Sequence, residues 1–168
     1  VAYDATLAGA WFDRGDTIVA IVTPTDGDKA GLGVMSNTGT AINTAPELLS
    51  LSLTPTSVYT DTTVTVLESM HDPDAGDSIS YTYEWFVDGV PAGGNQDSLA
   101  GTDFEKHQAV HVRVTPSDGL DSGTPLNSSS VTVLNSAPGT PNLSLTPAEP
   151  VPGVDDVLCG IASPAADL

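Results

Sequence analysis

The chain has 168 residues, with 4 Lys and Arg against 22 Asp and Glu and a formal net charge of -18. Binding to nucleic acid or to an anionic membrane surface needs clustered cations, so this composition excludes both as partners. No apolar run approaches the length of about 18 residues that a membrane span requires, which argues against membrane insertion. The sequence has neither an initiator Met nor an apolar leader, so we expect an internal piece of a longer protein or a processed product.

Short β-rich runs bounded by Pro, Gly, Asp and Asn follow one another along the chain, without helical periodicity. Alternation along these runs predicts which side chains face a core. In chain order, we expect strands at Thr17–Val22, Thr40–Ile42, Leu49–Leu53, Thr62–Leu67, Ile79–Val87, about 90–97, about 98–101, Val110–Val114, Ser130–Leu134, Leu143–Leu145 and Val157–Ile161. The inward positions are Val64, Val66, Tyr81, Tyr83, Trp85, Val110, Val112 and Val114.

A repeat with a spacing of 92 residues divides the chain, because Leu7–Pro55 aligns without a gap on Leu99–Pro147 and is identical at 20 of 49 positions. Seven or so short strands in a unit of this size are typical of an immunoglobulin-like β-sandwich. We therefore predict an all-β chain of such sandwiches in tandem, with one complete and two partial units. Residues 1–45 would be the C-terminal half of a first repeat, 46–137 a complete repeat, and 138–168 the N-terminal part of a third.

An acidic loop, Asp72-Pro73-Asp74-Ala75-Gly76-Asp77, lies between two expected strands of the complete repeat. Carboxylates spaced around a Gly-permitted turn can converge on one Ca²⁺, which takes six to eight oxygen ligands. In a sandwich of this type the Asp118 loop lies at the same pole. The alternative is a tight turn held only by hydrogen bonds from side chain to backbone. The candidate calcium ligands are Asp72, Asp74, Asp77, Asp118, Asp121 and Glu47, with Asp26 and Asp28 as the equivalent half-site of the first unit.

Several strings of the sequence resemble the PKD/cadherin-like immunoglobulin-fold repeats of prokaryotic extracellular surface proteins. They are Asn-x-Ala-Pro, Leu-x-Leu-Thr-Pro, Asp-x-Asp-x-Gly-Asp, Tyr-x-Tyr-x-Trp-x-Val-Asp-Gly and Val-Thr-Pro-x-Asp-Gly. The resemblance implies extracellular tandem arrays, frequent calcium sites and roles in adhesion or in cell-surface fibres. Many similar repeats carry a pair of Cys on two strands of the sandwich, at the positions that Val66 and Val112 hold here.

With one residue inserted in the third unit, Cys159 aligns with Val66, so it is either half of a disulfide whose other half lies outside this chain or a buried free thiol. Asn127 and Asn142 lie in N-glycosylation sequons, which matter only if the source glycosylates. The row of Tyr81, Tyr83 and Trp85 favours a core, with carbohydrate binding as the alternative if these rings are exposed.

Together these patterns predict a structural module of an extracellular fibre, appendage or surface stalk, with calcium at the junctions and no enzymatic activity. Its partners would be further copies of the same repeat, in a homopolymer or a long tandem array, with surface glycans as a further partner. The alternative is a carbohydrate-binding or spacer domain attached to a secreted hydrolase or adhesin. Either function places the protein outside the cell or at its surface.

Overall fold

The computed structural model describes residues 5–163. Its helical elements are two 3-10 turns, η1 (Gly9–Trp11) and η2 (Gly101–Asp103). In the described part of the chain, no helix has the length and apolarity to cross a membrane. The strands are β1 (Thr17–Ile18), β2 (Ile21–Val22), β3 (Val34–Met35), β4 (Gly39–Thr40), β5 (Glu47–Thr54), β6 (Val58–Tyr59), β7 (Val64–His71), β8 (Ser80–Val87), β9 (Val90–Ala92), β10 (Ser98–Leu99), β11 (Ala109–Ser117), β12 (Leu126–Asn127), β13 (Val131–Leu134), β14 (Asn142–Thr146) and β15 (Leu158–Ser163).

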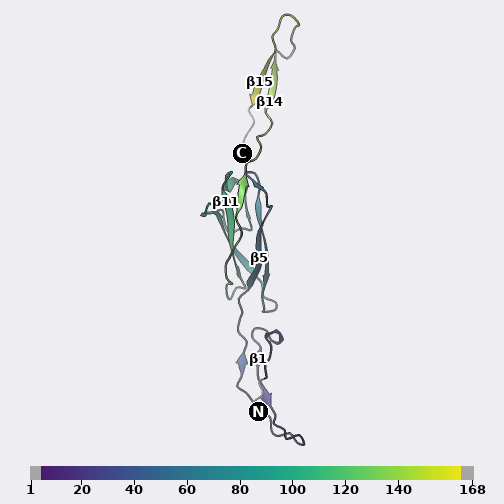
Figure 1. Cartoon of the computed structure of the whole chain (residues 1–168), viewed down its shortest axis with the longest axis vertical. Coiled ribbons are helices and arrows are strands. Elements are labelled where there is room, and N and C mark those ends of the chain that lie inside the picture. Colours follow the sequence, from purple (N-terminus) through teal and green to yellow (C-terminus); the bar gives the residue numbers. More distant parts are fainter. Residues whose placement is uncertain (1–4, 164–168) are drawn as a thin grey trace. The chain divides into compact units, whose positions relative to one another are not determined.

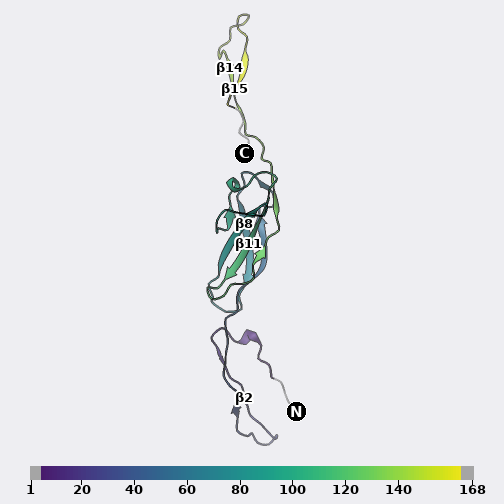
Figure 2. The ribbon, with the colours of Figure 1, turned by 90° about the vertical axis from the view of Figure 1, so that its left-hand side faces the viewer.

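The strands of the central segment form two sheets. One has the order β10-β7-β5, and the other has the order β6-β13-β11-β8-β9 with β12 added on β11. Figure 1 labels β5 and β11, and Figure 2 shows β8 beside β11. β6 runs parallel to β13, so the chain leaves the first sheet after β5 and joins the second sheet at β6. This all-β arrangement of several sheets is compatible with a β-sandwich.

The remaining strands form three two-stranded ladders, counted over residues 5–163: β1 with β4, β2 with β3, and β14 with β15 (Figure 1). Sequence reasoning located the long strands, with ends shifted by at most four residues. It missed the two-residue strands β3, β6 and β12, which are too short to show a period.

Compactness divides the chain into two units that both draw segments from the central repeat. The first unit comprises Val1–Leu51, Glu68–Tyr83 and Arg113–Asn127, and the second comprises Ser52–Leu67, Glu84–Val112 and Ser128–Leu168. The two compact units do not coincide with the predicted repeats. The repeat boundaries after residues 45 and 137 therefore stay a prediction.

The second unit holds most of the apolar core. Trp85 is 1 % exposed, and its indole N–H donates to the carbonyl of Gln96 at 2.9 Å. Every second residue at the start of β7 and along β11 is buried, as alternation requires when one face of a sheet is covered. The side chains buried in this unit are Leu53, Val58, Val64, Val66, Trp85, Val87, Leu99, Phe104, Val110, Val112 and Val133.

Tyr81 and Tyr83, in the first unit, lie on the same face of β8 as Trp85, as alternation predicts, but they are half-buried whereas Trp85 is buried. The Tyr83 hydroxyl donates to Glu68 Oε1 at 2.9 Å, and the two rings lie 6.1 Å apart. A phenol that hydrogen-bonds to a partly exposed carboxylate keeps its polar end near water. Desolvation, with a further contribution from the charge of Glu68, raises the pKa of Tyr81.

The sequence repeat is matched by a repeat of backbone geometry. Thr17 pairs with Thr40 in the β1–β4 ladder, and Ala109 pairs with Thr132 in the β11–β13 ladder, 92 residues later in both strands. The β2–β3 and β11–β12 ladders correspond in the same way, as do η1 and η2. The peptide bonds before Pro55 and Pro147 are both cis. Equivalent positions therefore adopt equivalent backbone conformations, which allows residues 92 apart to be compared directly.

Replacing Trp85 by Ala should lower the free energy of unfolding by about 3–5 kcal/mol, because it leaves a large cavity and removes the indole hydrogen bond. Trp11 is 79 % exposed, so Trp11→Ala is the matched control and should change stability by less than about 0.5 kcal/mol. Urea unfolding followed by circular dichroism measures both. Equal effects of the two substitutions would contradict this assignment of the core.

Candidate metal site

The loop between β7 and β8 is folded by its own aspartates. Asp72 Oδ1 accepts the backbone N–H of Asp74 at 2.9 Å, a turn that Asp favours. Gly76 has a φ of +87°, a conformation that residues with a Cβ rarely adopt. These two features bring the two ends of the loop together, so that Asp72 and Asp77 approach each other.

The loop after β11 uses the same device. Asp118 Oδ1 accepts the backbone N–H groups of Leu120 and Asp121, both at 2.7 Å. These N–H groups bind the charged form, and the N–H of Asp121 contributes most to lowering the pKa of Asp118. The side-chain amide of Asn43 is the second cause, and the N–H of Leu120 and the charge of Arg14 add smaller contributions. Asp118 is therefore held as a carboxylate at neutral pH.

The two loops bring three carboxylates together in the first unit. Asp72, Asp77 and Asp118 each offer one oxygen, and these oxygens lie within 4.8 Å of one another. Two oxygens bound to one Ca²⁺ at about 2.3–2.6 Å lie at most about 5 Å apart, so the cluster has the size of a calcium site. Without a counterion, two unit charges at this separation, such as those of Asp72 and Asp77, repel by about 3 kcal/mol at an effective dielectric constant of about 20.

Three buried oxygens at this cluster lack a hydrogen-bond donor among the described residues. They are Asp72 Oδ2, Asp77 Oδ2 and Asn43 Oδ1. The side chain of Asp77 is only 10 % exposed, so its second oxygen is shielded from water as well. Buried oxygen atoms of this kind are costly unless they are paired or coordinate a cation. The donor set, two carboxylates and one amide carbonyl, consists of the hard oxygen ligands that Ca²⁺ prefers.

Residues of the preceding repeat contact the same loops. Arg14 Nη2 forms an ion pair with Asp77 Oδ1. Asn43 Nδ2 donates to Asp118 Oδ2 at 2.8 Å and to Asp121 Oδ2 at 2.9 Å. The backbone N–H of Thr44 donates to Oδ2 of the buried Asp74 at 2.7 Å. We call Asp72, Asp74, Asp77, Asp118 and Asp121 the acidic pole, and Arg14, Asn43 and Thr44 the linker set.

The structure distributes the predicted ligands unequally. Asp72, Asp77 and Asp118 lie in the cluster. Asp74 and Asp121 lie outside it and accept hydrogen bonds from Thr44 and Asn43. Glu47 is exposed at the start of β5. Asp26 and Asp28 form a turn, in which Asp26 Oδ1 accepts the N–H groups of Asp28 and Lys29. Within residues 5–163, the metal-sized group of carboxylates contains neither of these two, so the equivalent half-site stays a prediction.

The other candidate residues lie on exposed strands. Cys159 in β15 is exposed and pairs with Leu145 of β14, so the idea of a buried thiol does not apply here. A disulfide to a cysteine of another chain stays a prediction. Asn127 and Asn142 are exposed, as a glycosylation site requires.

Sequence reasoning missed the side chains of the linker set. Arg14 is one of four Lys and Arg residues in the chain, and Asn43 recurs as Asn135 in the next repeat. A rare cation and a repeated Asn beside a junction were the signals that could have found them.

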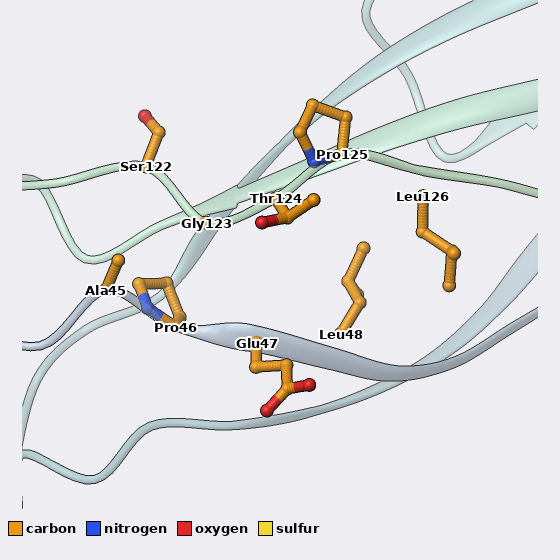
Figure 3. Close-up of a pocket in the computed structure, with 9 residues that line it drawn as sticks. All are labelled: Ala45, Pro46, Glu47, Leu48, Ser122, Gly123, Thr124, Pro125 and Leu126. Carbon is orange, nitrogen blue, oxygen red and sulfur yellow. The ribbon is translucent and has the colours of Figure 1, made fainter.

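A shallow groove of about 460 Å³ lies near the acidic pole (Figure 3). Residues 45–48 line one side and residues 122–126 the other, with Glu47 and Leu48 on opposite sides of their strand. Gly123 allows the two segments to approach, since a Cβ there would lie 1.9 Å from the Pro46 carbonyl oxygen. Glu47 is the titratable residue of its lining, so the groove offers no cluster of groups for chemistry.

No protein-family model matches the chain, and no curated protein matches it significantly. The functional argument therefore rests on the geometry of the acidic pole and on the internal repeat.

Replacing Asn43 by Ala should raise the pKa of Asp118 towards its ordinary value, because one donor to the carboxylate is lost. The pKa of Asp26, lowered by the N–H groups of Lys29 and then Asp28, is the matched control and should not move. NMR titration of the carboxyl carbons measures both values. An unchanged Asp118, or an equal rise at Asp26, would contradict the contact.

The pH dependence has a definite sign. Because the pKa of Asp118 is lowered in the folded state, the unfolded chain takes up this proton first as the pH falls. Its contribution to stability is therefore complete above about pH 4 and is lost as the pH falls through the folded value.

Proposed function

We propose that this chain is a non-enzymatic structural module of an extracellular fibre, appendage or surface stalk. In this proposal, immunoglobulin-like β-sandwich repeats are joined end to end, and Ca²⁺ stiffens each junction. The repeated strand registers support the tandem architecture, since positions 92 residues apart pair in the same way. Residues 1–45, 46–137 and 138–168 are the three repeat segments on this view.

The observation that carries the proposal is the contact between the linker set and the acidic pole. Arg14 and Asn43 belong to the first repeat segment, and Asp77 and Asp118 belong to the second. Their contacts form a joint inside the first compact unit. An enzyme would need a cleft with converging reactive groups, whereas this polar cluster connects consecutive repeats.

At the joint, Asp72, Asp77 and Asp118 would hold the ion, with the carbonyl oxygen of Asn43 as a neutral ligand. The ion would neutralise carboxylates that Arg14 alone leaves in excess. The ion would stabilise the joint electrostatically, because carboxylates of both loops and the carbonyl oxygen of Asn43 would bind the same cation. Extracellular calcium modules bind with dissociation constants of about 10⁻⁴–10⁻³ M, so we expect an affinity in this range at the joint.

The proposed partners are further copies of the same repeat. In the first repeat segment, Ile21, Val22 and Val34 are each at least 65 % exposed, whereas Val114, the equivalent of Val22, is fully buried. The first, partial repeat therefore exposes an apolar strand residue whose equivalent is buried in the complete repeat, and a further copy could cover it.

A second candidate is a carbohydrate-binding or spacer domain of a secreted hydrolase or adhesin. The half-buried, adjacent rings of Tyr81 and Tyr83 favour it, because sugars stack on accessible aromatic faces. A glycan-array experiment tests this function, and binding lost in Tyr81→Ala would support it over a purely structural role.

Calcium should raise the melting temperature of the full chain, since a ligand at 100 times its dissociation constant stabilises the folded state by about 2.7 kcal/mol. For a chain of this size that corresponds to about 5–10 °C. Asp72→Asn should remove most of this rise, because it replaces a buried charged oxygen while keeping the acceptor for the Asp74 N–H.

Asp26→Asn is the matched control, because it makes the same substitution in an exposed turn outside the cluster. Differential scanning calorimetry in Ca²⁺ and in EDTA measures the difference. The same melting temperature in both buffers would refute the calcium joint.

A further inference from the structure

The pole of the central repeat after β13 carries a second copy of the linker set. Lys106, Asn135 and Ser136 lie 92 residues after Arg14, Asn43 and Thr44. The chain has 4 Lys and Arg in total, so two of them occupy this one repeat position. In a chain of net charge -18, a cation that recurs at one position is a specific feature of the joint and not part of a mixed charged surface.

The backbone holds both sets in the same way. The N–H of Gly15 donates to the carbonyl of Ala41 at 2.9 Å, and the N–H of His107 donates to that of Val133 at 2.8 Å. The return bonds, from Ala41 to Asp16 and from Val133 to Gln108, are both 2.9 Å. The residue after the cation has a positive φ in each case, +88° at Gly15 and +73° at His107. The cation and the Asn are therefore fixed to equivalent points of the same turn and strand.

The second set carries the same kinds of donor group as the first set, although Ser136 is buried and Thr44 is exposed. Arg14 binds Asp77 through one nitrogen, Nη2, so an ammonium group can replace it without losing a two-pronged contact. Asn135 keeps the amide donor of Asn43. Thr44 acts through its backbone N–H, which Ser136 also has.

The side chains of Lys106 and Asn135 bond to each other and to the adjacent backbone, whereas Ser136 Oγ accepts from Thr60 Oγ1 at 2.7 Å and donates to Asp61 Oδ1 at 3.4 Å. Lys106 Nζ donates to Asn135 Oδ1 at 3.1 Å, and Asn135 Nδ2 donates to the Ser136 carbonyl at 2.6 Å. Lys106 and Asn135 are exposed. This leaves an ammonium group and a carboxamide together at a surface where a carboxylate loop can reach them.

We propose that Lys106, Asn135 and Ser136 form the docking surface for the acidic pole of the following repeat. The carboxylate equivalent to Asp77 binds Lys106, those equivalent to Asp118 and Asp121 bind Asn135, and the one equivalent to Asp74 binds the Ser136 N–H. This inference rests on the proposed function, because it requires repeats in series. It adds a covalently fixed cation to each joint, which acts whether or not a metal ion is bound.

The first test transfers the second set onto the acidic pole of the full chain. Arg14→Lys with Thr44→Ser places Lys, Asn and Ser where the structure shows the carboxylates. Amine acetylation in EDTA, read by mass spectrometry, compares the new lysine with Lys29 and Lys106, the chain's two natural lysines. We expect the new lysine to react about fivefold more slowly than both, the factor that an ion pair of moderate strength gives.

Thermal unfolding of the same variant should match the unsubstituted chain, and Arg14→Ala should melt lower. A new lysine as reactive as Lys29, or a double variant that melts like Arg14→Ala, would overturn the proposal. The measurement in EDTA separates this outcome from the calcium joint, because no metal ion contributes.

The second test supplies the following repeat. The full chain is lengthened by residues 76–137 of its own sequence, which complete the third repeat, with Lys106→Gln in the added copy. Acetylation of the original Lys106 should fall about fivefold relative to Lys29. Unchanged reactivity, while the indole N–H groups of both Trp85 copies are protected from hydrogen exchange, would overturn docking at this surface. If the indole N–H of the added Trp85 copy is not protected, the added repeat has not folded. The acetylation and unfolding of the variant with Arg14→Lys and Thr44→Ser then decide whether the proposal stands.

Discussion

The joint between the repeats depends on how the charges of five carboxylates, gathered in two short loops, are compensated by hydrogen bonds and cations. Most of the contacts are hydrogen bonds: N–H groups donate to Asp72, Asp74, Asp118 and Asp121. Among the described residues, one contact to these carboxylates carries a full positive charge, the ion pair of Arg14 with Asp77. The cluster is therefore well ordered by hydrogen bonds yet short of cationic charge, which is the electrostatic condition for binding a divalent ion.

The same turn serves two purposes in this chain. Asp26 and Asp118 accept equivalent backbone N–H groups, and both have a lowered pKa. Only Asp118 lies beside a second acidic loop, and only there does the ordered turn become part of a cation-sized cluster. The turn thus forms from local sequence alone. The candidate site also needs the carboxylates of the neighbouring loop and the contacts of the linker set.

Sequence alone predicted the long strands and most of the core, because β7 and β11 alternate between buried and open positions. It also placed Asp72 and Asp77 in one loop, which is local information, and it placed Asp118 at the same pole only through the expected sandwich fold. It could not predict the contacts of Arg14 and Asn43, which join segments more than 60 residues apart. Alternation assigned Tyr81 to the face of β8 that carries Trp85, but it could not predict that Tyr81 is only half-buried, because it does not tell how far the cover extends along the strand.

The most direct test of the account is a calcium titration of the full chain observed at the carboxyl carbons by NMR. If the acidic pole binds one ion, the signals of Asp72, Asp77 and Asp118 shift together and saturate at one Ca²⁺ per chain, while those of Asp26 and Asp28 stay in place. Shifts that spread evenly over all aspartates without saturation would show only loose counterions around an acidic surface, and would contradict the account.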